Sequence, residues 1–305
     1  MTIHFGTELI QAQWSDSTVC IGVFDGVHLG HQRVISFAVQ GAREREQPSI
    51  LLTFDRHPAS IIAPDRVPLS IATLSQNLDQ FKSLGISIAV VIPFDQVTAN
   101  TTAQEFLDTV LQGKLKAEHL VVGHDFAFGK NRQGTGEWLS GQIATTIIEP
   151  LVQDGHRISS SEIRQFIREG SVEKAHAFLG RPYEFQGTVV RGQKLGRTLG
   201  YPTLNLVPSS AVCIPKNGVY GGWCRTPIGV FLAATSVGVR PTVDGTHQTI
   251  ESYLIDYPGE NLYGANVELG FSWRLRDEVK FESVELMVEQ IQKDVAQVRN
   301  LASGN

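Results

Sequence analysis

Apolar and polar positions follow two different patterns along this chain, and the first extends to about residue 180. Short apolar runs of strand length alternate there with longer stretches in which apolar residues recur at helical spacing. The apolar runs are Val19–Phe24, Ser49–Phe54, Ile86–Pro93 and His119–Gly123. The helical stretches are His31–Glu46, Leu74–Leu84 and Ala103–Leu111. This alternation predicts βαβ units around a parallel sheet, whose ligands bind beyond the carboxyl ends of the strands.

Two shorter helical patterns mark the end of this first part. The segment Ser159–Arg168 opens with the spacing of a capping box, and the segment Ser171–Leu179 stops at Gly180, shortly before Pro182. We therefore predict one domain of residues 1–180 and a second domain of residues 181–305.

Beyond Tyr183 the pattern changes to short alternating segments between turns that contain glycine and proline. These segments are Glu184–Val190, Val230–Val237, Thr249–Ile255 and Asn266–Leu275. Their alternation predicts an antiparallel barrel or sandwich. A last amphipathic helix should pack on it through one apolar stripe, formed by Val284, Val288, Ile291, Val295 and Val298. The second domain has the commonest domain size, so we expect it to fold alone.

Composition and charge narrow the choice of partners. Lys plus Arg is 26 and Asp plus Glu is 31, a formal charge of −5, whereas nucleic-acid binding usually shows as a basic domain. Residues Met1 to Trp14 lack the features of a signal peptide, and the apolar run Ile86–Ile92 is too short to span a bilayer. We expect a cytoplasmic protein with no nucleic-acid or membrane partner, and its oligomeric state stays open. Cys20, Cys213 and Cys224 stand at no metal or redox spacing, which predicts reduced core residues.

The densest chemical signal is the segment Gly22–His31, which reads Gly-Val-Phe-Asp-Gly-Val-His-Leu-Gly-His. A buried strand runs there into a glycine-rich turn and then into a helix, and a helix N-terminus favours phosphate. Gly26 and Gly30 would let the backbone approach an anion closely, and His28 and His31 would donate hydrogen bonds to the oxygens of a phosphorus centre. Two alternatives stay open: zinc bound by Asp25 and both histidines, or capping and core packing alone.

A second glycine-rich segment covers Gly187–Leu206, with three glycines at intervals of four. Pro202 and the surrounding strand pattern predict a loop whose backbone amides bind phosphate, not a helical packing face. The Gly-Lys-Ser/Thr of a Walker A loop does not occur in this segment. The glycines by themselves do not decide between function and structure.

The first motif resembles the His-x-Gly-His of nucleotidyltransferases, in the longer form of bacterial bifunctional riboflavin kinase/FAD synthetases. Three further segments resemble that family in order: Thr53–Pro58, Gly123–Gly129 with Arg132 and Gly134, and Ile158–Arg164. Alone, each also fits a plain structural role, as a strand end, a loop with packed aromatics or a capped surface helix. The resemblance implies two catalytic residues, His28 and His31. It implies binding of flavin, nucleotide or phosphates by Gly22, Phe24, Asp25, Gly26, Gly30, Asp55, His57, Gly123, Asp125, Phe126, Phe128, Arg132, Ser159, Ser160, Ser161 and Arg164.

The second segment resembles the riboflavin kinase signature Gly-Arg-x-Leu-Gly-x-Pro-Thr-Ala-Asn, with Leu204 in place of the alanine. The resemblance implies that Thr203 and Asn205 bind Mg²⁺ and nucleotide, and that Glu251 is catalytic. Tyr253 stands where the family commonly has histidine. The other implied binding residues are Gly192, Gly196, Arg197, Gly200, Pro202, Tyr220 and Arg276.

Together the resemblances imply an α/β Rossmann-like nucleotidyltransferase domain, followed by a small antiparallel β-barrel domain with a C-terminal helix. They imply that ATP phosphorylates riboflavin to FMN with Glu251 as general base, and that FMN then attacks the α-phosphorus of ATP, giving FAD and pyrophosphate. The expected partners are these small molecules and Mg²⁺. A different nucleotidyltransferase, a kinase with an inactive first domain and a non-catalytic flavin-binding module remain as alternatives.

Overall fold

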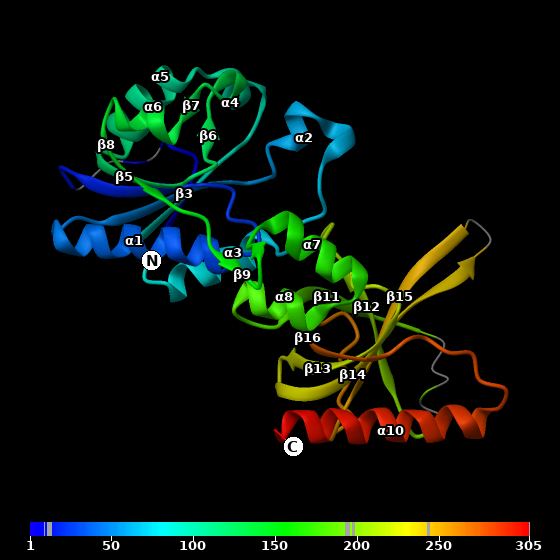
Figure 1. Cartoon of the computed structure of the whole chain (residues 1–305). Coiled ribbons are helices and arrows are strands. Elements are labelled where there is room, and N and C mark those ends of the chain that lie inside the picture. Colours follow the sequence, from blue (N-terminus) through cyan, green and yellow to red (C-terminus); the bar gives the residue numbers. More distant parts are fainter. Residues whose placement is uncertain (9, 11–13, 193–195, 197–198, 243–244, 305) are drawn as a thin grey trace. The chain divides into compact units, whose positions relative to one another are not determined.

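The chain forms two compact units, which a computed structural model describes over residues 1–8, 10, 14–192, 196, 199–242 and 245–304 (Figure 1). For residues 240–242 and 245–247 only the backbone is described. Unit 1 comprises Met1–Leu69 and Leu74–Ser160, and unit 2 comprises Ser70–Thr73 and Ser161–Asn305. Among the described residues no helix is both long and apolar enough to cross a membrane.

Unit 1 is built on a six-stranded parallel sheet in the order β1-β4-β3-β2-β5-β8. Its strands are β1 (Thr2–Phe5), β2 (Ser17–Ile21), β3 (Ser49–Phe54), β4 (Ile88–Ile92), β5 (Ala117–Gly123) and β8 (Ala144–Ile148). The longer helices are α1 (Leu29–Glu44), α3 (Leu74–Ser83) and a π-helix (Leu107–Lys114) that follows α5 (Ala103–Phe106). Shorter elements are α2 (Ala59–Ile62), a 3₁₀ turn (Pro64–Arg66), α4 (Gln96–Asn100), β6 (Ala127–Phe128), a 3₁₀ turn (Lys130–Arg132), β7 (Gly134–Thr135), α6 (Gly136–Ser140), β9 (Val152–Gln153) and β10 (His156–Arg157).

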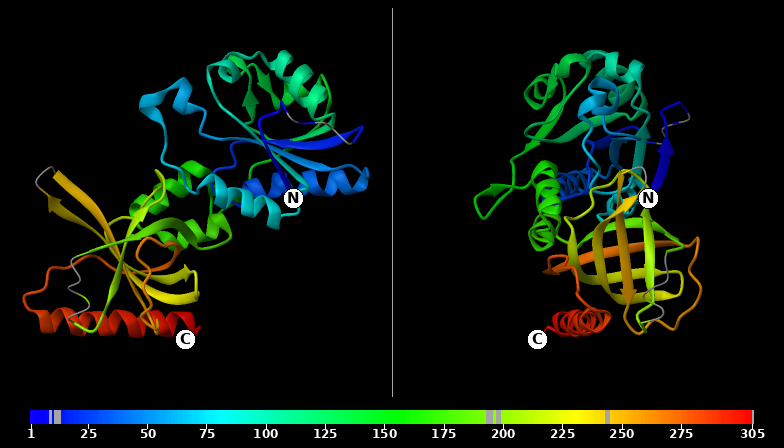
Figure 2. Two further views of the ribbon diagram at one scale, coloured as in Figure 1. Left: turned by 180° about the vertical axis from the view of Figure 1, so that it is seen from behind. Right: turned by 90° about the vertical axis from the view of Figure 1, so that its right-hand side faces the viewer.

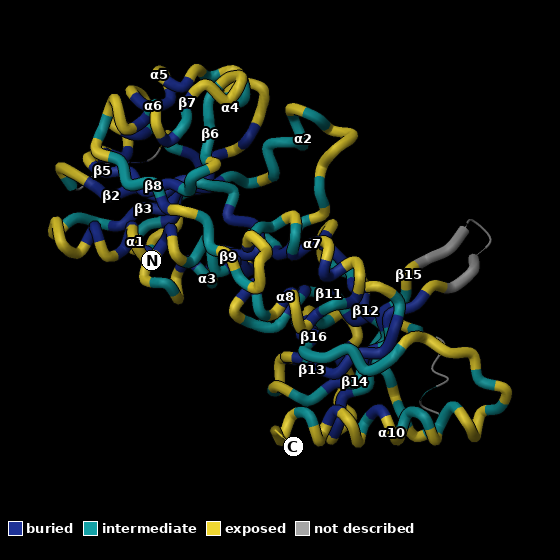
Figure 3. Tube along the Cα trace, viewed as in Figure 1, coloured by how far each residue is buried: buried dark blue, intermediate teal, exposed yellow. Residues whose placement is uncertain are grey.

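The strands β2, β3 and β5 are largely buried (Figure 3). Alternation of their side chains produces two apolar layers, one on each face of the sheet. Cys20, Leu51 and Val121 face α1 and α3, whose buried residues include Ile35 and Phe81. The neighbouring strand positions face the other way, toward the α5 and π-helix segment and α6. The three layers explain why the strands read as continuous apolar runs in the sequence.

Unit 2 contains a closed antiparallel barrel in the order β11-β12-β15-β14-β13-β16 (Figure 2). Its strands are β11 (Tyr183–Val190), β12 (Thr203–Pro208), β13 (Gly218–Thr226), β14 (Gly229–Thr242), β15 (Gly245–Leu254) and β16 (Asn266–Arg276). Its described helices are α7 (Ser160–Glu169), whose first residue still belongs to unit 1, α8 (Val172–Leu179) and α10 (Val284–Ala302). The last helix packs on β13 and β14. Val298 is buried on it as expected, but Val284 at the other end of the predicted stripe is exposed.

The fold class expected from the sequence is confirmed, and so are the buried, free states of Cys20, Cys213 and Cys224. Burial raises the pKa of the Cys224 thiol to about 12, which keeps it protonated. One correction concerns β12. The sequence predicted a loop through Thr203 and Asn205, whereas the strand begins at Thr203, directly after Pro202.

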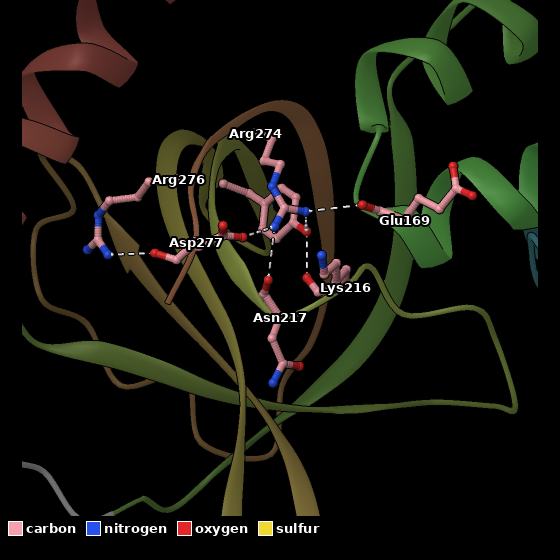
Figure 4. A network of polar contacts seen from close by, with 7 residues as sticks. Glu169, Lys216, Asn217, Arg274, Arg276 and Asp277 are labelled. Atoms are coloured by element: carbon pink, nitrogen blue, oxygen red, sulfur yellow. Dashed lines mark hydrogen bonds and ion pairs between the residues drawn. The ribbon is translucent and has the colours of Figure 1, made fainter. Parts of the chain in front are cut away.

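The compact units divide between Ser160 and Ser161, twenty positions before the predicted boundary at Gly180. The physical reason is that α8 packs on β11 and β16 and that Arg274 binds both helices. The Arg274 backbone N–H donates to Glu173 at 2.8 Å, and its Nη1 donates to the Glu169 carbonyl at 3.4 Å (Figure 4). Gly170 lies between these two contacts, where a Cβ atom would collide with the Arg274 guanidinium.

This boundary gives a testable difference between two fragments. We expect residues 161–305 to unfold cooperatively and residues 181–305 to melt at least about 5 °C lower, because the shorter fragment uncovers β11 and β16 and removes partners of Arg274. Both fragments lack Ser70–Thr73, which also belong to unit 2, so the loss of this segment affects both melting temperatures alike. Circular dichroism melting curves make the measurement. Equal melting temperatures would mean that residues 161–180 do not stabilise the barrel and that the domain boundary lies at Gly180.

Candidate active sites

The first candidate site is a cavity of about 1050 Å³ in unit 1, beyond the carboxyl ends of β2, β3 and β5. Side chains that the sequence spreads over more than a hundred positions meet there. Gly22 and Phe24 come from the turn after β2, and His31 comes from α1. The segment after β3 contributes His57. The end of β5 contributes Gly123, and the segment after it contributes Asp125, Phe126, Phe128 and Arg132.

The turn between β2 and α1 has an unusual backbone. Phe24, Gly26 and Val27 have φ angles of 50°, 78° and 42°, in the left-handed region that β-branched residues such as valine rarely enter. The Phe24 ring lies over Gly22, where a Cβ atom would stand 3.1 Å from the ring. Glycine at position 22 therefore makes room for the ring, and glycine at position 26 accommodates the backbone.

His28 begins α1 as its N-cap residue. The His31 backbone N–H donates to His28 Nδ1 at 3.2 Å, so in the neutral imidazole the proton resides on Nε2. The two imidazole rings stack with centroids 3.6 Å apart. A Cβ atom at Gly30 would lie 3.1 Å from the His28 ring, so the glycine permits this packing. His28 is buried, whereas His31 lines the cavity.

The zinc alternative gains no support from this geometry. His28 Nδ1 accepts the capping hydrogen bond, and a metal would have to displace that bond. Within the described part of the chain, no group of three or more His, Cys, Asp or Glu side chains is placed to bind a metal ion. The capping alternative and the phosphate prediction, in contrast, are compatible, because one ring nitrogen caps the helix while the other carries a proton.

The backbone N–H of Gly26 does not point at a free anion-binding position. It donates to Asn77 Oδ1 on α3 at 3.2 Å. The Asp25 carbonyl accepts a hydrogen bond from Ser160 Oγ at 3.1 Å, and Asp25 itself is buried. Gly26 thus contributes to the site through its left-handed backbone conformation and not through a free N–H group. Its partner Asn77 belongs to no motif that the sequence analysis identified.

Asp55 lies beside the cavity and stabilises its wall. Its carboxylate accepts from the Phe94 N–H at 2.9 Å and pairs with Arg56 at 2.8 Å. Partial burial raises the pKa of Asp55, but the Arg56 and Phe94 hydrogen bonds outweigh it and the net pKa is lowered. The structure therefore places Asp55 at the junction of β3 and β4, whereas Phe54 and His57 on either side of it line the cavity.

The segment after β5 presents both aromatic and charged groups to the cavity. Phe126 and Phe128 stack with centroids 5.5 Å apart, and Arg132 Nη2 donates to the Asp125 carbonyl at 3.4 Å. Asp125 forms an ion pair with Arg157. Burial alone would raise the pKa of Asp125, but the Arg157 hydrogen bond and charge lower it, so the carboxylate is ionised at neutral pH.

The residues of the Ile158–Arg164 element divide between the units. Ser159 and Ser160 belong to unit 1, and Ser160 bonds to the turn through Asp25. Ser161 is exposed at the start of α7 in unit 2, and Arg164 is buried on the same helix.

The second candidate site is a cavity of about 300 Å³ within unit 2. Strand register explains its composition, because Glu251 on β15 lies opposite Asn205 on β12 and opposite Ser236 on β14. Thr203 lies opposite Tyr253 in the same way, and all five side chains line the cavity. Thr203 Oγ1 donates to Glu251 Oε2 at 3.4 Å.

Glycines bring the preceding loop close to this strand. A Cβ atom at Gly192 would collide with the Asn205 amide at 2.3 Å, and one at Gly196 would collide with the Tyr201 carbonyl at 2.3 Å. Gly196 lines the cavity, and Gly200 has a φ of 82° just before Tyr201 and Pro202. Arg197, also expected to bind here, lies outside the described residues.

Arg276 lines the cavity and forms a bidentate ion pair that the sequence did not predict. Its Nε and Nη2 donate to the Asp294 carboxylate on α10 at 3.0 and 2.7 Å. Asp294 is buried, and the Arg276 guanidinium stands 5.8 Å from the Phe281 ring centroid. The available signal was an acidic residue three positions after Ile291, inside the apolar stripe of the last helix.

Tyr220 was expected at this site, and the structure places it elsewhere. Alternation along β13 turns Val219 toward the cavity and Tyr220 into the core, edge-on to Phe271. The Tyr220 hydroxyl donates to the Lys216 carbonyl and accepts from Arg274 at 3.1 Å. Burial raises its pKa to about 12, so the phenol stays neutral and structural.

Known families match both units of the chain. A family model described as FAD synthetase matches residues 10–162, and one described as riboflavin kinase matches residues 179–302. The bifunctional riboflavin kinase/FMN adenylyltransferase of Bacillus subtilis is 35% identical, with 96% of this chain and 95% of that protein covered. The protein of the same name from Escherichia coli K12 is 32% identical, with 94% and 93% covered.

One solved structure is similar over the whole chain. It is a crystal structure described as a macrolide-efflux protein from Streptococcus pneumoniae, and it matches with a TM-score of 0.91 and 32% sequence identity. The match covers 98% of this chain and 99% of that one.

The ion pair between Asp294 and Arg276 gives a test of how α10 is attached. Asp294→Ala leaves the half-buried Arg276 without its carboxylate and should lower the free energy of unfolding by about 2–3 kcal/mol. Lys293→Ala, an exposed neighbour on the same helix, should change it by less than about 0.5 kcal/mol. Urea unfolding of both variants makes the comparison, and an unchanged Asp294→Ala variant would mean that apolar contacts alone attach the helix.

Proposed function

The chain belongs to the bifunctional riboflavin kinase/FMN adenylyltransferase family, and we propose that it phosphorylates riboflavin to FMN in unit 2 and adenylylates FMN to FAD in unit 1. ATP is the second substrate of both steps. We extend this proposal to the individual residues that carry each step, to the magnesium ion and to the cellular compartment.

In the kinase step, Glu251 accepts the proton of the terminal ribityl hydroxyl as that oxygen attacks the γ-phosphorus of ATP. An alcohol needs a base because its pKa lies far above neutrality. Three observations support the choice: Glu251 lines the cavity, it lies opposite Asn205 and it accepts a hydrogen bond from Thr203. Arg276 lines the same cavity, where Asp294 and Phe281 fix its guanidinium for contact with substrate.

Thr203 and Asn205 would bind a magnesium ion at this site. Their hydroxyl and amide oxygens are hard donors, and both side chains line the same face of the cavity as Glu251. When bound, Mg²⁺ neutralises charge on the phosphate oxygens of ATP. The side chains of the two residues also orient the nucleotide toward Glu251.

In the adenylyl transfer, a phosphate oxygen of FMN attacks the α-phosphorus of ATP and pyrophosphate leaves. A phosphate monoester is mostly dianionic at neutral pH, so this step needs no general base. It needs positioning and charge neutralisation instead. We assign these roles to the start of α1, His28, His31, Ser160 and Arg164. Phe126 and Phe128 offer an apolar surface suited to a flavin ring.

We assign the enzyme to the cytoplasm, the compartment that its sequence predicts. The single observation that carries the whole proposal is that motif residues meet at two cavities. Thr203, Asn205 and Glu251 line one, and Gly22, Phe24 and His31 line the other.

The decisive experiment is incubation of the purified protein with riboflavin and MgATP, followed by chromatography. We expect FMN to appear first and FAD to follow. FMN without FAD would support a kinase with an inactive first unit, and no FMN, with nucleotidyl transfer to another acceptor, would support a different nucleotidyltransferase. Binding of riboflavin without any product would indicate a flavin-binding module.

The role of His28 predicts a separation of the two activities. His28→Ala should slow FAD formation from supplied FMN by about 10²–10³-fold, the scale for losing one transition-state donor, and leave FMN formation intact. His28→Asn is the matched control, since asparagine retains a capping oxygen for α1 but has no imidazole. If the asparagine variant recovers full FAD synthesis, His28 is only a cap.

The role of Glu251 predicts the opposite separation. Glu251→Gln preserves the size of the side chain and removes the base, so FMN formation should fall by about 10²–10⁴-fold. Supplied FMN should still be converted to FAD at the normal rate. Steady-state rates of both reactions on the same preparation make the measurement, and undiminished kinase activity would assign the base to another residue.

A further inference from the structure

The backbone between β2 and α1 is conformationally strained at residues that have side chains. Phe24 and Val27 have φ angles of 50° and 42°, and Val27 is fully buried. Such a conformation is unfavourable for a residue with a side chain, and it persists only when surrounding contacts determine it. The position of His28, the next residue, therefore depends on the groups that bind this turn.

Side chains of four described residues form hydrogen bonds with the backbone of the turn. Thr53 Oγ1 donates to the Val23 carbonyl at 3.2 Å, and Gln32 Nε2 donates to the Val27 carbonyl at 2.9 Å. The other two bonds are those of Ser160 to the Asp25 carbonyl and of Asn77 to the Gly26 N–H. Thr53 lies at the end of β3, Gln32 on α1 and Ser160 in the serine-rich element, but Asn77 comes from a helix without any family motif in the sequence.

Asn77 is an unusual residue for its place on α3. It is only 7% exposed, and a buried amide costs free energy unless its polar atoms are hydrogen-bonded. The same helix packs Phe81 edge-on against Phe24, with ring centroids 5.8 Å apart. The helix thus touches the turn twice, through an aromatic contact at Phe24 and through a polar contact two residues further at Gly26.

We propose that Asn77 is a positioning residue for adenylyl transfer. Its side-chain oxygen binds the Gly26 N–H and so maintains the strained turn that places the His28 ring at the start of α1. The inference rests on the proposed function of unit 1. It adds a residue from α3 to the site, and it assigns that residue no contact with substrate.

The test compares Asn77→Leu and Asn77→Ala with Leu78→Ala, a buried neighbour on α3 whose apolar side chain forms no hydrogen bond with the turn. FAD formation from FMN and ATP is measured well below the melting temperature of each variant, and FMN formation by the same chain is the internal reference. We expect both Asn77 variants to lower kcat for FAD formation by about 10–10²-fold, the scale of a misplaced catalytic group, with the KM for FMN and the kinase rate unchanged. Leu78→Ala should retain the normal kcat. Equal kcat values for the Asn77 and Leu78 variants would overturn the proposal.

A double variant separates positioning from general destabilisation. If Asn77 acts through the turn that carries His28, Asn77→Leu combined with His28→Ala should be no more than about threefold slower than His28→Ala alone. Fully multiplicative losses would overturn the proposal. A wild-type protein that forms no FAD would instead contradict the proposed function, so the two failures are distinguishable.

Discussion

The N-terminal site depends on one hydrogen bond, from the His31 backbone N–H to His28 Nδ1. A helix start needs an acceptor for its free N–H groups, and serine, threonine, aspartate or asparagine usually supplies it. Here an imidazole does so. The same bond fixes the orientation of the ring and leaves the proton on Nε2, so one contact begins the helix and prepares a donor. Gly30 permits the ring to lie there, and the strained turn before it sets its direction.

In the barrel, the pairing register of neighbouring strands brings the site residues together, whereas unit 1 uses a strained turn. Side chains from β12, β14 and β15 meet because these strands are neighbours and their pairing brings Asn205, Glu251 and Ser236 into one row. The loop before β12 then approaches closely at Gly192 and Gly196. The α10 helix completes the wall through the ion pair of Asp294 with Arg276, so a C-terminal element contributes to a site whose motif lies ninety residues earlier.

The pattern of apolar residues predicted those strands and helices whose apolar positions recur at regular spacing along the sequence. Ser49–Phe54 agrees with β3 over its full length, and α1 and α3 differ by a few residues at their ends. The closing helix was predicted, but not the role of Asp294, because the value of a buried carboxylate depends on an arginine eighteen positions away. The compact units divide twenty positions before the predicted domain boundary at Gly180, and the sequence of α8 does not reveal that this helix packs on β11 and β16.

The sequence also predicted the site residues only in part, because contacts between distant segments decide which side chains reach a cavity. Motif positions such as His31, Asp125, Thr203 and Glu251 do line the cavities, whereas Tyr220 follows the strand alternation into the core. Asn77 had no sequence signal at all, because a polar residue on an amphipathic helix is normally exposed and only the tertiary structure brings it to Gly26.

The most direct test of the capping interaction is the ¹⁵N NMR spectrum of the histidine rings at a pH where they are neutral, with His28→Asn used to assign the His28 signals. Since Nδ1 accepts the His31 N–H, His28 should be the Nε2–H tautomer, with an unprotonated Nδ1. A His28 ring protonated on Nδ1 would contradict the account, because that nitrogen would then be unable to cap α1.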